Sequence, residues 1–283
     1  MDHSEIIEPF ERMLAEVFTS SAIRAIEAGG EWRPAWDAME QSGYLDALVS
    51  EEKGGFGLGW AVAAALFQAL GKHAVPLPVG ETIILRGLQA EAGEAAPVGP
   101  LQPAVASGSL DSHLSEATSA TPVTIQSEKL SPQLALLYSA QIAGAAARLL
   151  DMTVAYANER AQFGKPIGRQ QAVQQQLAVM AEQVVATRLA VELASACGEP
   201  DRLRAASAKA IASRYAASIA ATAHAVHGAI GISAEYDLQL YTRRLHAWRL
   251  AGGAESHWEV QLGEAVLASS NTSLDWVRAN LDR

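Results

Sequence analysis

Cysteine, basic residues and long apolar runs are all scarce in this chain of 283 residues. The single cysteine, Cys197, cannot form an intrachain disulfide. Lysine and arginine number 21 against 31 acidic residues, giving a formal net charge of −10. A nucleic-acid-binding surface needs clustered lysine and arginine side chains, so none is expected. The opening residues, MDHSEIIEPFERML, carry acids where a secretory signal has bases before an apolar run, and we predict a cytoplasmic location.

The chain also lacks an apolar window long enough to span a membrane. Such a span takes about 18 residues or more, and Arg, Glu, Gln or His interrupts every stretch rich in Ala, Leu and Val. What the sequence does contain is an apolar fraction of 49%, built mainly from Ala and Leu. Because these side chains lose little freedom in a helix, we predict a soluble, mainly α-helical protein with no membrane span.

Glycine and proline divide the chain into predicted helices. In the first half we expect helices at about 4–27, 61–70 and 82–92, and a short helix that carries Trp36 and Met39 and stops at Gly43. Ser131–Pro132 is a helix-start signal, and the second half is expected to hold helices at about 131–158, 169–197 and 201–226, a shorter one from 238 and a last long one after 254. Four long helices with short connections predict an antiparallel four-helix bundle.

The segment between the two helical halves differs from both in composition. Residues 92–130 contain four prolines and many Ser, Gly and Thr, which is typical of a linker or of a few short strands. We therefore predict an N-terminal helical domain at 1–92, a linker at 93–130 and a C-terminal helical bundle at 131–283.

Three motifs occur in order along the chain. The first runs from Trp36 through Gly43 to EEKGGFGLG, the second is ERAQFGKPIGRQQAVQQQLAVMA at 159–181, and the third is HAVHGAIGISAEYDLQLYTRRLHAWRLAGGAESHW at 224–258. Together they resemble the acyl-CoA dehydrogenase family. The resemblance implies two helical domains around a β-domain, which the short linker leaves vestigial or absent, together with an FAD cofactor and an acyl-CoA thioester substrate.

The resemblance also implies which residues meet FAD. In the family an arginine at the position of Arg160 contacts the FAD diphosphate across a subunit interface, a task suited to a fixed charge with several donors. An ordinary exposed turn residue is the alternative for Arg160. Ala225, Ala229 and Ala254 depart from the family pattern, which has Gln, Gly and Thr there. The predicted cofactor-binding residues are Arg160, Gln162, Phe163, Gln170, Gln171, Gly228 and Ser256.

The catalytic carboxylate of the family is missing from its usual positions. In the family it takes the α-proton of the acyl thioester, and it stands where this chain has Gly252 or, in a subset of members, near Leu134 or Ala135. Glu255 is the nearest acid. It is either a displaced base or a helix N-terminal residue favoured by the helix dipole. No other catalytic residue is predicted.

These features favour an acyl-CoA dehydrogenase-like subunit that is itself catalytically deficient. It would act on a bulky or ring-bearing acyl-CoA in lipid or steroid catabolism, as a hetero-oligomer in which a related complete subunit shares the FAD site. The alternatives are a flavin-free helical scaffold or CoA-ester-binding protein, and a lyase or hydratase on the same fold. No metal is predicted, because no cysteine or carboxylate cluster accompanies the histidines at 224, 227, 246 and 257.

Overall fold

The computed structural model describes residues 4–104, 120–162, 164–196 and 198–281 of the chain. Most of these residues are helical, which confirms the predicted mainly-α architecture with at most a vestigial β-domain. Within the described ranges, no helix combines the length and the apolar character that crossing a membrane requires.

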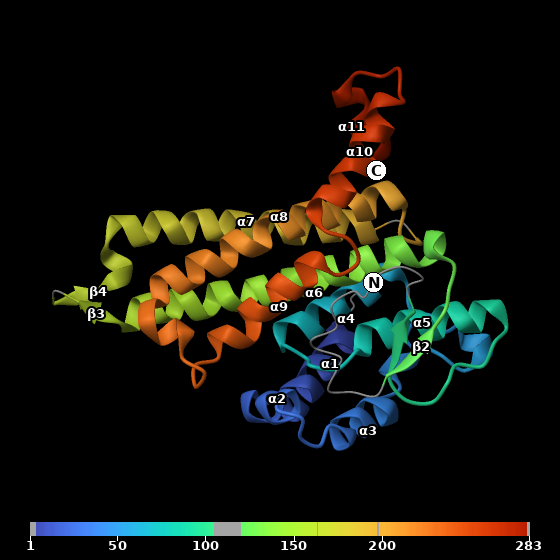
Figure 1. Ribbon diagram of the computed structural model, residues 1–283, viewed down its shortest axis with the longest axis horizontal. Coiled ribbons are helices and arrows are strands. Elements are labelled where there is room, and N and C mark those ends of the chain that lie inside the picture. The colour runs from blue at the N-terminus through green and yellow to red at the C-terminus, as the bar shows by residue number, and fades with distance from the viewer. Residues whose placement is uncertain (1–3, 105–119, 163, 197, 282–283) are drawn as a thin grey trace.

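The N-terminal half contributes five helices, coloured blue to cyan-green in Figure 1. The predicted helix at 4–27 is wrong as a single element, because Thr19 starts a new helix: its hydroxyl accepts a hydrogen bond from the amide of Ala22 at 3.3 Å. Gly43 ends the third helix at φ +77°, as its position predicts. The five helices are α1 (Ser4–Val17), α2 (Ser20–Glu27), α3 (Arg33–Ser42), α4 (Trp60–Lys72) and α5 (Val79–Ala92).

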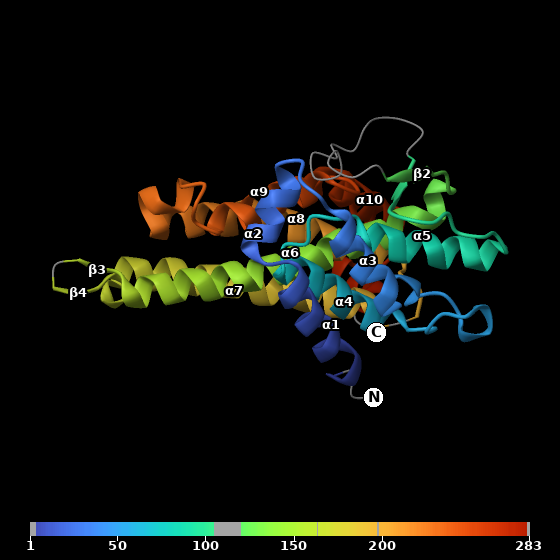
Figure 2. The ribbon, with the colours of Figure 1, turned by 90° about the horizontal axis from the view of Figure 1, so that it is seen from below.

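The C-terminal half forms the predicted antiparallel bundle. The carboxylate of Asp201 begins one of its helices by accepting hydrogen bonds from the amides of Leu203 and Arg204, at 3.0 and 3.1 Å. The three longest helices pack against one another, and the shorter helix at 238–250 packs against the first and third of them (Figures 1 and 2). The helices are α6 (Ser127–Glu159), α7 (Gln171–Ser195), α8 (Arg202–His227), α9 (Leu238–Leu250), α10 (Glu255–Leu267) and α11 (Ser273–Asn280).

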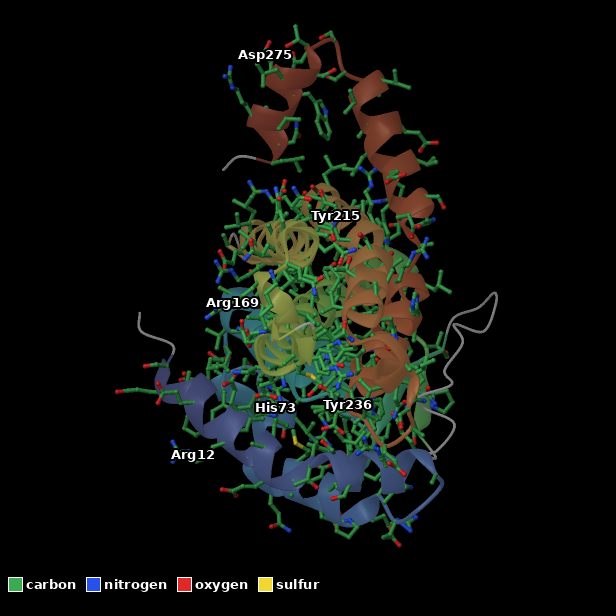
Figure 3. All side chains as sticks on the ribbon, turned by 90° about the vertical axis from the view of Figure 1, so that its left-hand side faces the viewer. Arg12, His73, Arg169, Tyr215, Tyr236 and Asp275 are labelled. Carbon is green, nitrogen blue, oxygen red and sulfur yellow. The ribbon has the colours of Figure 1, made fainter. Side chains whose placement is uncertain are left out.

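Two predicted helix boundaries in this half are wrong. Helix α6 begins at Ser127 rather than at Ser131, and Pro132 lies inside it, because the added turn buries Leu130 against the core. The predicted last long helix is two helices, since the hydroxyl of Thr272 accepts from the amide of Asp275 and starts α11. Helices α10 and α11 project from the body of the molecule (Figures 1 and 3).

Extended structure is sparse among the described residues. Strands β1 (Leu101–Pro103) and β2 (Thr121–Val123) pair in parallel between α5 and α6, and β3 (Ala161–Gln162) and β4 (Lys165–Pro166) form a small hairpin between α6 and α7. One cluster of buried apolar side chains runs from the N-terminal helices into the bundle. The division into 1–92, 93–130 and 131–283 therefore stays a prediction.

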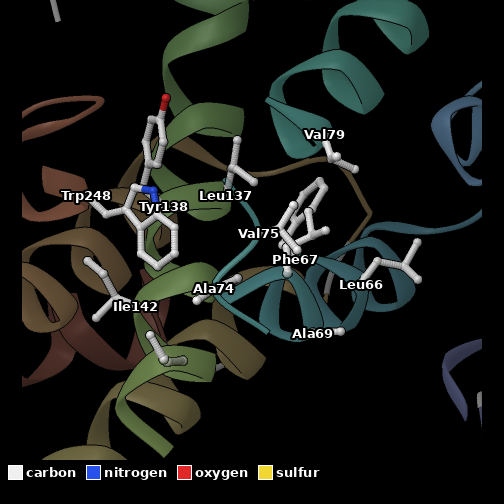
Figure 4. Close-up of a cluster of buried hydrophobic side chains, with 14 of the residues drawn as sticks. Leu66, Phe67, Ala69, Ala74, Val75, Val79, Leu137, Tyr138, Ile142 and Trp248 are labelled. Atoms are coloured by element: carbon white, nitrogen blue, oxygen red, sulfur yellow. The ribbon is translucent and has the colours of Figure 1, made fainter. Parts of the chain in front are cut away.

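Helices α4 and α6 connect the two halves through direct backbone contact. A Cβ atom on Gly144 would lie 1.9 Å from the carbonyl oxygen of Gln68, and one on Gly71 would lie 2.0 Å from that of Gln141. Only glycine fits at such a distance. Figure 4 shows the apolar side chains on either side of this crossing, with Phe67 from α4 and Leu137 from α6 among them.

Candidate functional site

Five of the predicted cofactor residues lie together at one end of the bundle. Arg160 caps the C-terminus of α6, Gln162 lies in β3, Gln170 and Gln171 begin α7, and Gly228 ends α8. The end of α8 is held beside α6 because the Tyr156 and His227 rings stack at 4.4 Å and the Tyr156 hydroxyl donates to the His227 carbonyl at 3.3 Å. We call these five residues the hairpin-end group; Figure 3 views the molecule from this side.

The hairpin end carries positive charge that is open to an anion. The side chain of Arg160 is exposed and forms no hydrogen bond or ion pair with any described residue, and the same holds for Lys165 and Arg169. Gly228 adopts φ +63°, and a Cβ atom there would meet nothing within 4 Å, so its backbone is open to a ligand. Phe163 lies outside the described residues. Three unpaired cations beside open backbone are suited to a diphosphate.

Gly252 and Gly253 form the turn between α9 and α10, at the expected position of the base. Both have positive φ, +66° and +99°. The buried ammonium of Lys209 donates to the carbonyl oxygens of Gly253 and Arg249, both at 2.9 Å, and the indole of the buried Trp258 donates to that of Gly252 at 2.9 Å. Burial lowers the pKa of Lys209 to about 7, against the opposing charge of Glu255. Side chains from α8 and α10 thus fix this turn.

Glu255 is poorly suited to act as a base. The guanidinium of Arg249 donates from Nε to Oε2 of Glu255 at 3.0 Å, and this hydrogen bond lowers the pKa of the carboxyl. A carboxylate that is already engaged and more acidic than usual has little tendency to take a proton from carbon.

Ser256 does not join the hairpin-end group. It is exposed at the start of α10, near the end of α8 that holds Lys209. Lys209 and His227 are 18 residues apart on α8, which corresponds to roughly 27 Å at the rise of an α-helix. The structure therefore divides the predicted cofactor residues into two separate regions.

The structure adds a carboxyl–phenol pair that the sequence did not reveal. The Cβ atom that Gly252 lacks would lie 2.9 Å from Cδ2 of Tyr138 and 3.6 Å from the backbone of Leu134. The two expected base positions are therefore close together, and the Gly252 position borders the Tyr138 ring. The Tyr138 hydroxyl donates to Oε1 of Glu81 at 3.0 Å. A signal was present, since Glu81 is the one acid in the apolar stretch 74–88. We call Glu81, Tyr138 and Gly252 the base-position cluster.

The histidines take part in packing. Nε2 of His224 lies 3.0 Å from the Thr242 hydroxyl, and Nδ1 of His227 lies 2.8 Å from the Ala223 carbonyl oxygen. Among the residues that the structure describes, no group of three or more His, Cys, Asp or Glu is placed to hold a metal ion.

Comparison with known proteins identifies the family. Residues 133–266 match the family model described as "Acyl-CoA dehydrogenase, C-terminal domain". Acyl-CoA dehydrogenase IpdE2 from Mycobacterium tuberculosis is 32% identical over 272 residues, an alignment that covers 80% of this chain and 85% of that protein. The chain belongs to the acyl-CoA dehydrogenase family. The 3-sulfinopropanoyl-CoA desulfinase of Paraburkholderia xenovorans is 34% identical, over 46% of this chain and 36% of its own length.

Solved structures of acyl-CoA dehydrogenases share the fold. A variant of the Tcur3481–Tcur3483 steroid ACAD is 20% identical with a TM-score of 0.80, and covers 94% of this chain and 98% of its own. A chain of the ChsE4–ChsE5 complex from Mycobacterium tuberculosis is 18% identical with a TM-score of 0.77, over 96% and 99% of the two chains. Within this acyl-CoA dehydrogenase fold, the hairpin end and the Gly252 turn are the two regions that hold the predicted site residues.

Proposed function

We propose that this chain is the catalytically deficient subunit of a heteromeric acyl-CoA dehydrogenase. The observation that carries the proposal is the base-position cluster, where a glycine with positive φ borders Tyr138 at the site of the family's carboxylate. A related, complete subunit supplies the missing carboxylate, and the two chains together oxidise an acyl-CoA thioester between its α- and β-carbons.

The hairpin-end group fits half of an FAD site. Arg160 would hold the diphosphate, with Lys165 and Arg169 adding positive charge, and Gly228 would let the cofactor approach the backbone of α8. When bound, FAD supplies the acceptor for the hydride that leaves the β-carbon. The separation of this group from the Gly252 turn supports a site that a second chain completes, since one flavin ring cannot lie beside both regions of the same chain.

The solved relatives support a partner and a substrate class. Two of them are described as a two-protein complex and as a two-protein steroid ACAD. We infer that this chain likewise pairs with a related subunit, and that the acyl group it handles is bulky or ring-bearing.

The test is co-expression of the chain with a related complete acyl-CoA dehydrogenase subunit from its native source. We expect a yellow, stoichiometric complex that dehydrogenates an acyl-CoA, and no appreciable turnover by the isolated chain. The absence of a placed general base alone costs on the order of 10²–10⁴-fold in rate. Robust turnover by the isolated chain, abolished by Glu255→Gln, would overturn the proposal.

Arg160→Ala tests the flavin half-site directly. We expect the flavin content of the purified complex to fall, because a charge-assisted contact to the diphosphate is lost. Arg12→Ala is the matched control, since Arg12 is also exposed but lies on α1. A colourless homo-oligomer that no subunit joins would favour the flavin-free scaffold instead.

A further inference from the structure

The carboxyl–phenol pair at the base-position cluster is placed to accept hydrogen bonds. The phenol of Tyr138 gives its one proton to Oε1 of Glu81, so the remaining lone pairs of the phenol oxygen and the second carboxylate oxygen are acceptors. Besides Tyr138, the backbone amide of Glu81 itself donates to this carboxylate, and burial raises the pKa of the carboxyl. Glu81 is partly exposed, whereas Tyr138 is buried.

The surroundings of the pair are apolar. Tyr138 is buried in the main hydrophobic cluster with Leu134, Leu137, Ile142 and Trp248, and in Figure 4 its hydroxyl points away from the labelled side chains. In such surroundings a hydrogen bond is stronger than in water, so a ligand group that donates to the pair is bound more tightly.

The pair is better suited to binding than to proton abstraction. Burial and the charge of Glu81 raise the pKa of Tyr138 well above its usual range, so the phenol keeps its proton at neutral pH. The Tyr138 ring also lies between Gly252 and Glu81, which keeps the carboxylate away from the position that a carboxylate at residue 252 would occupy.

We propose that Glu81 and Tyr138 form an acceptor site for a hydroxyl group on the acyl chain, close to the thioester, so that this subunit binds a hydroxyacyl-CoA in preference to the unsubstituted acyl-CoA. The hydroxyl is the group on an acyl chain that donates a hydrogen bond. Identification of the ligand as a CoA thioester rests on the proposed function.

The experiment is isothermal titration of the full-length chain, in its native complex, with 3-hydroxybutanoyl-CoA and with butanoyl-CoA. Hydrogen bonds to charged groups contribute about 1.5–3 kcal/mol, so we expect the hydroxylated thioester to bind roughly 10- to 100-fold more tightly. Glu81→Gln and Tyr138→Phe should each reduce this preference to about threefold or less. Tyr215→Phe, which removes a hydroxyl from a different helix, α8, should leave the preference unchanged.

The outcomes separate the two proposals. Equal affinity for both thioesters in the unaltered protein, or a preference that persists in both variants, overturns the acceptor site and leaves the proposed function standing. Binding of neither thioester overturns the acceptor site, while dehydrogenation by the complex tests the proposed function separately. Thermal melting of each variant shows whether it is folded, and Tyr138→Phe keeps the ring that packs in the core.

Discussion

Gly252 has a backbone conformation that opposes a catalytic carboxylate. Its φ of +66° is costly for any other residue, and the Tyr138 ring would lie 2.9 Å from an added Cβ. We expect Gly252→Glu to lower the free energy of unfolding by about 1–3 kcal/mol and to add no dehydrogenation, measured by urea denaturation and by turnover of the complex. Gly252→Ala separates the backbone cost from the effect of the carboxylate. A gain of base-dependent turnover in Gly252→Glu would contradict our account of this turn.

Lys209 makes a pH-dependent contribution to stability. Its pKa is lowered from 10.5 to about 7 by burial, so between pH 7 and 10 the unfolded chain binds more protons here than the folded chain. The free energy of unfolding therefore rises with pH, by up to about 1.4 kcal/mol per unit. We expect the stability of the unaltered protein relative to Lys209→Met to increase between pH 7 and 9, as measured by chemical denaturation. A difference that does not change with pH would contradict this.

The site residues differ in how far the sequence alone could predict them. Arg160, Gln170 and Gln171 could be predicted to act together, because they fall within one continuous motif whose turn keeps them close. The roles of Glu81, Tyr138 and Lys209 could not be predicted, because they depend on contacts between residues separated by 40 or more positions in the chain. The resemblance to the family predicted the importance of the Gly252 position. The sequence could not predict the Tyr138 ring beside it, because that contact depends on how α6 packs against α9.

The sequence pattern predicted most of the helices correctly and failed mainly at their boundaries. Helix existence followed from Ala- and Leu-rich periodicity and from terminators such as Gly43, which depend on local backbone geometry. The errors came where a cap competed with a continuous apolar pattern, at Thr19 and Thr272, and where core burial extended α6 past Ser131.

The crossing of α4 and α6 gives a prediction about an element. Gly144→Ala places a methyl group where the Gln68 carbonyl stands, so the helices must separate, and we expect a loss of at least about 2 kcal/mol in the free energy of unfolding. Gly263→Ala is the control, because a Cβ there meets nothing within 4 Å in the interior of α10. It should be neutral or slightly stabilising. Urea denaturation of both variants gives the answer, and equal stabilities would rule out a tight crossing.

For the whole molecule, exposed apolar side chains on α7 support association through the bundle. Val179, Val185, Leu189 and Leu193 are each about half exposed, at 45–53%. We expect the chain to be an oligomer by light scattering, and Leu189→Glu to shift it toward the monomer by placing a charge in the interface. Val98→Glu, at an exposed position between α5 and β1, should not. A strict monomer, alone and with its partner, would contradict this expectation.

The parallel pair β1–β2 has a consequence for how this architecture can change. Leu101 stands opposite Thr121 and Pro103 opposite Val123, and flanking hydrogen bonds of 2.8 Å join Ala104 to Val123 and Thr121 to Pro100. The chain thus leaves and re-enters the body through two anchored neighbours, whatever lies between them. Such a junction tolerates large changes of length, because neither α5 nor α6 has to move. It is the place where evolution could shorten an entire domain, and where an engineer could graft a foreign one, without refolding the helices on either side.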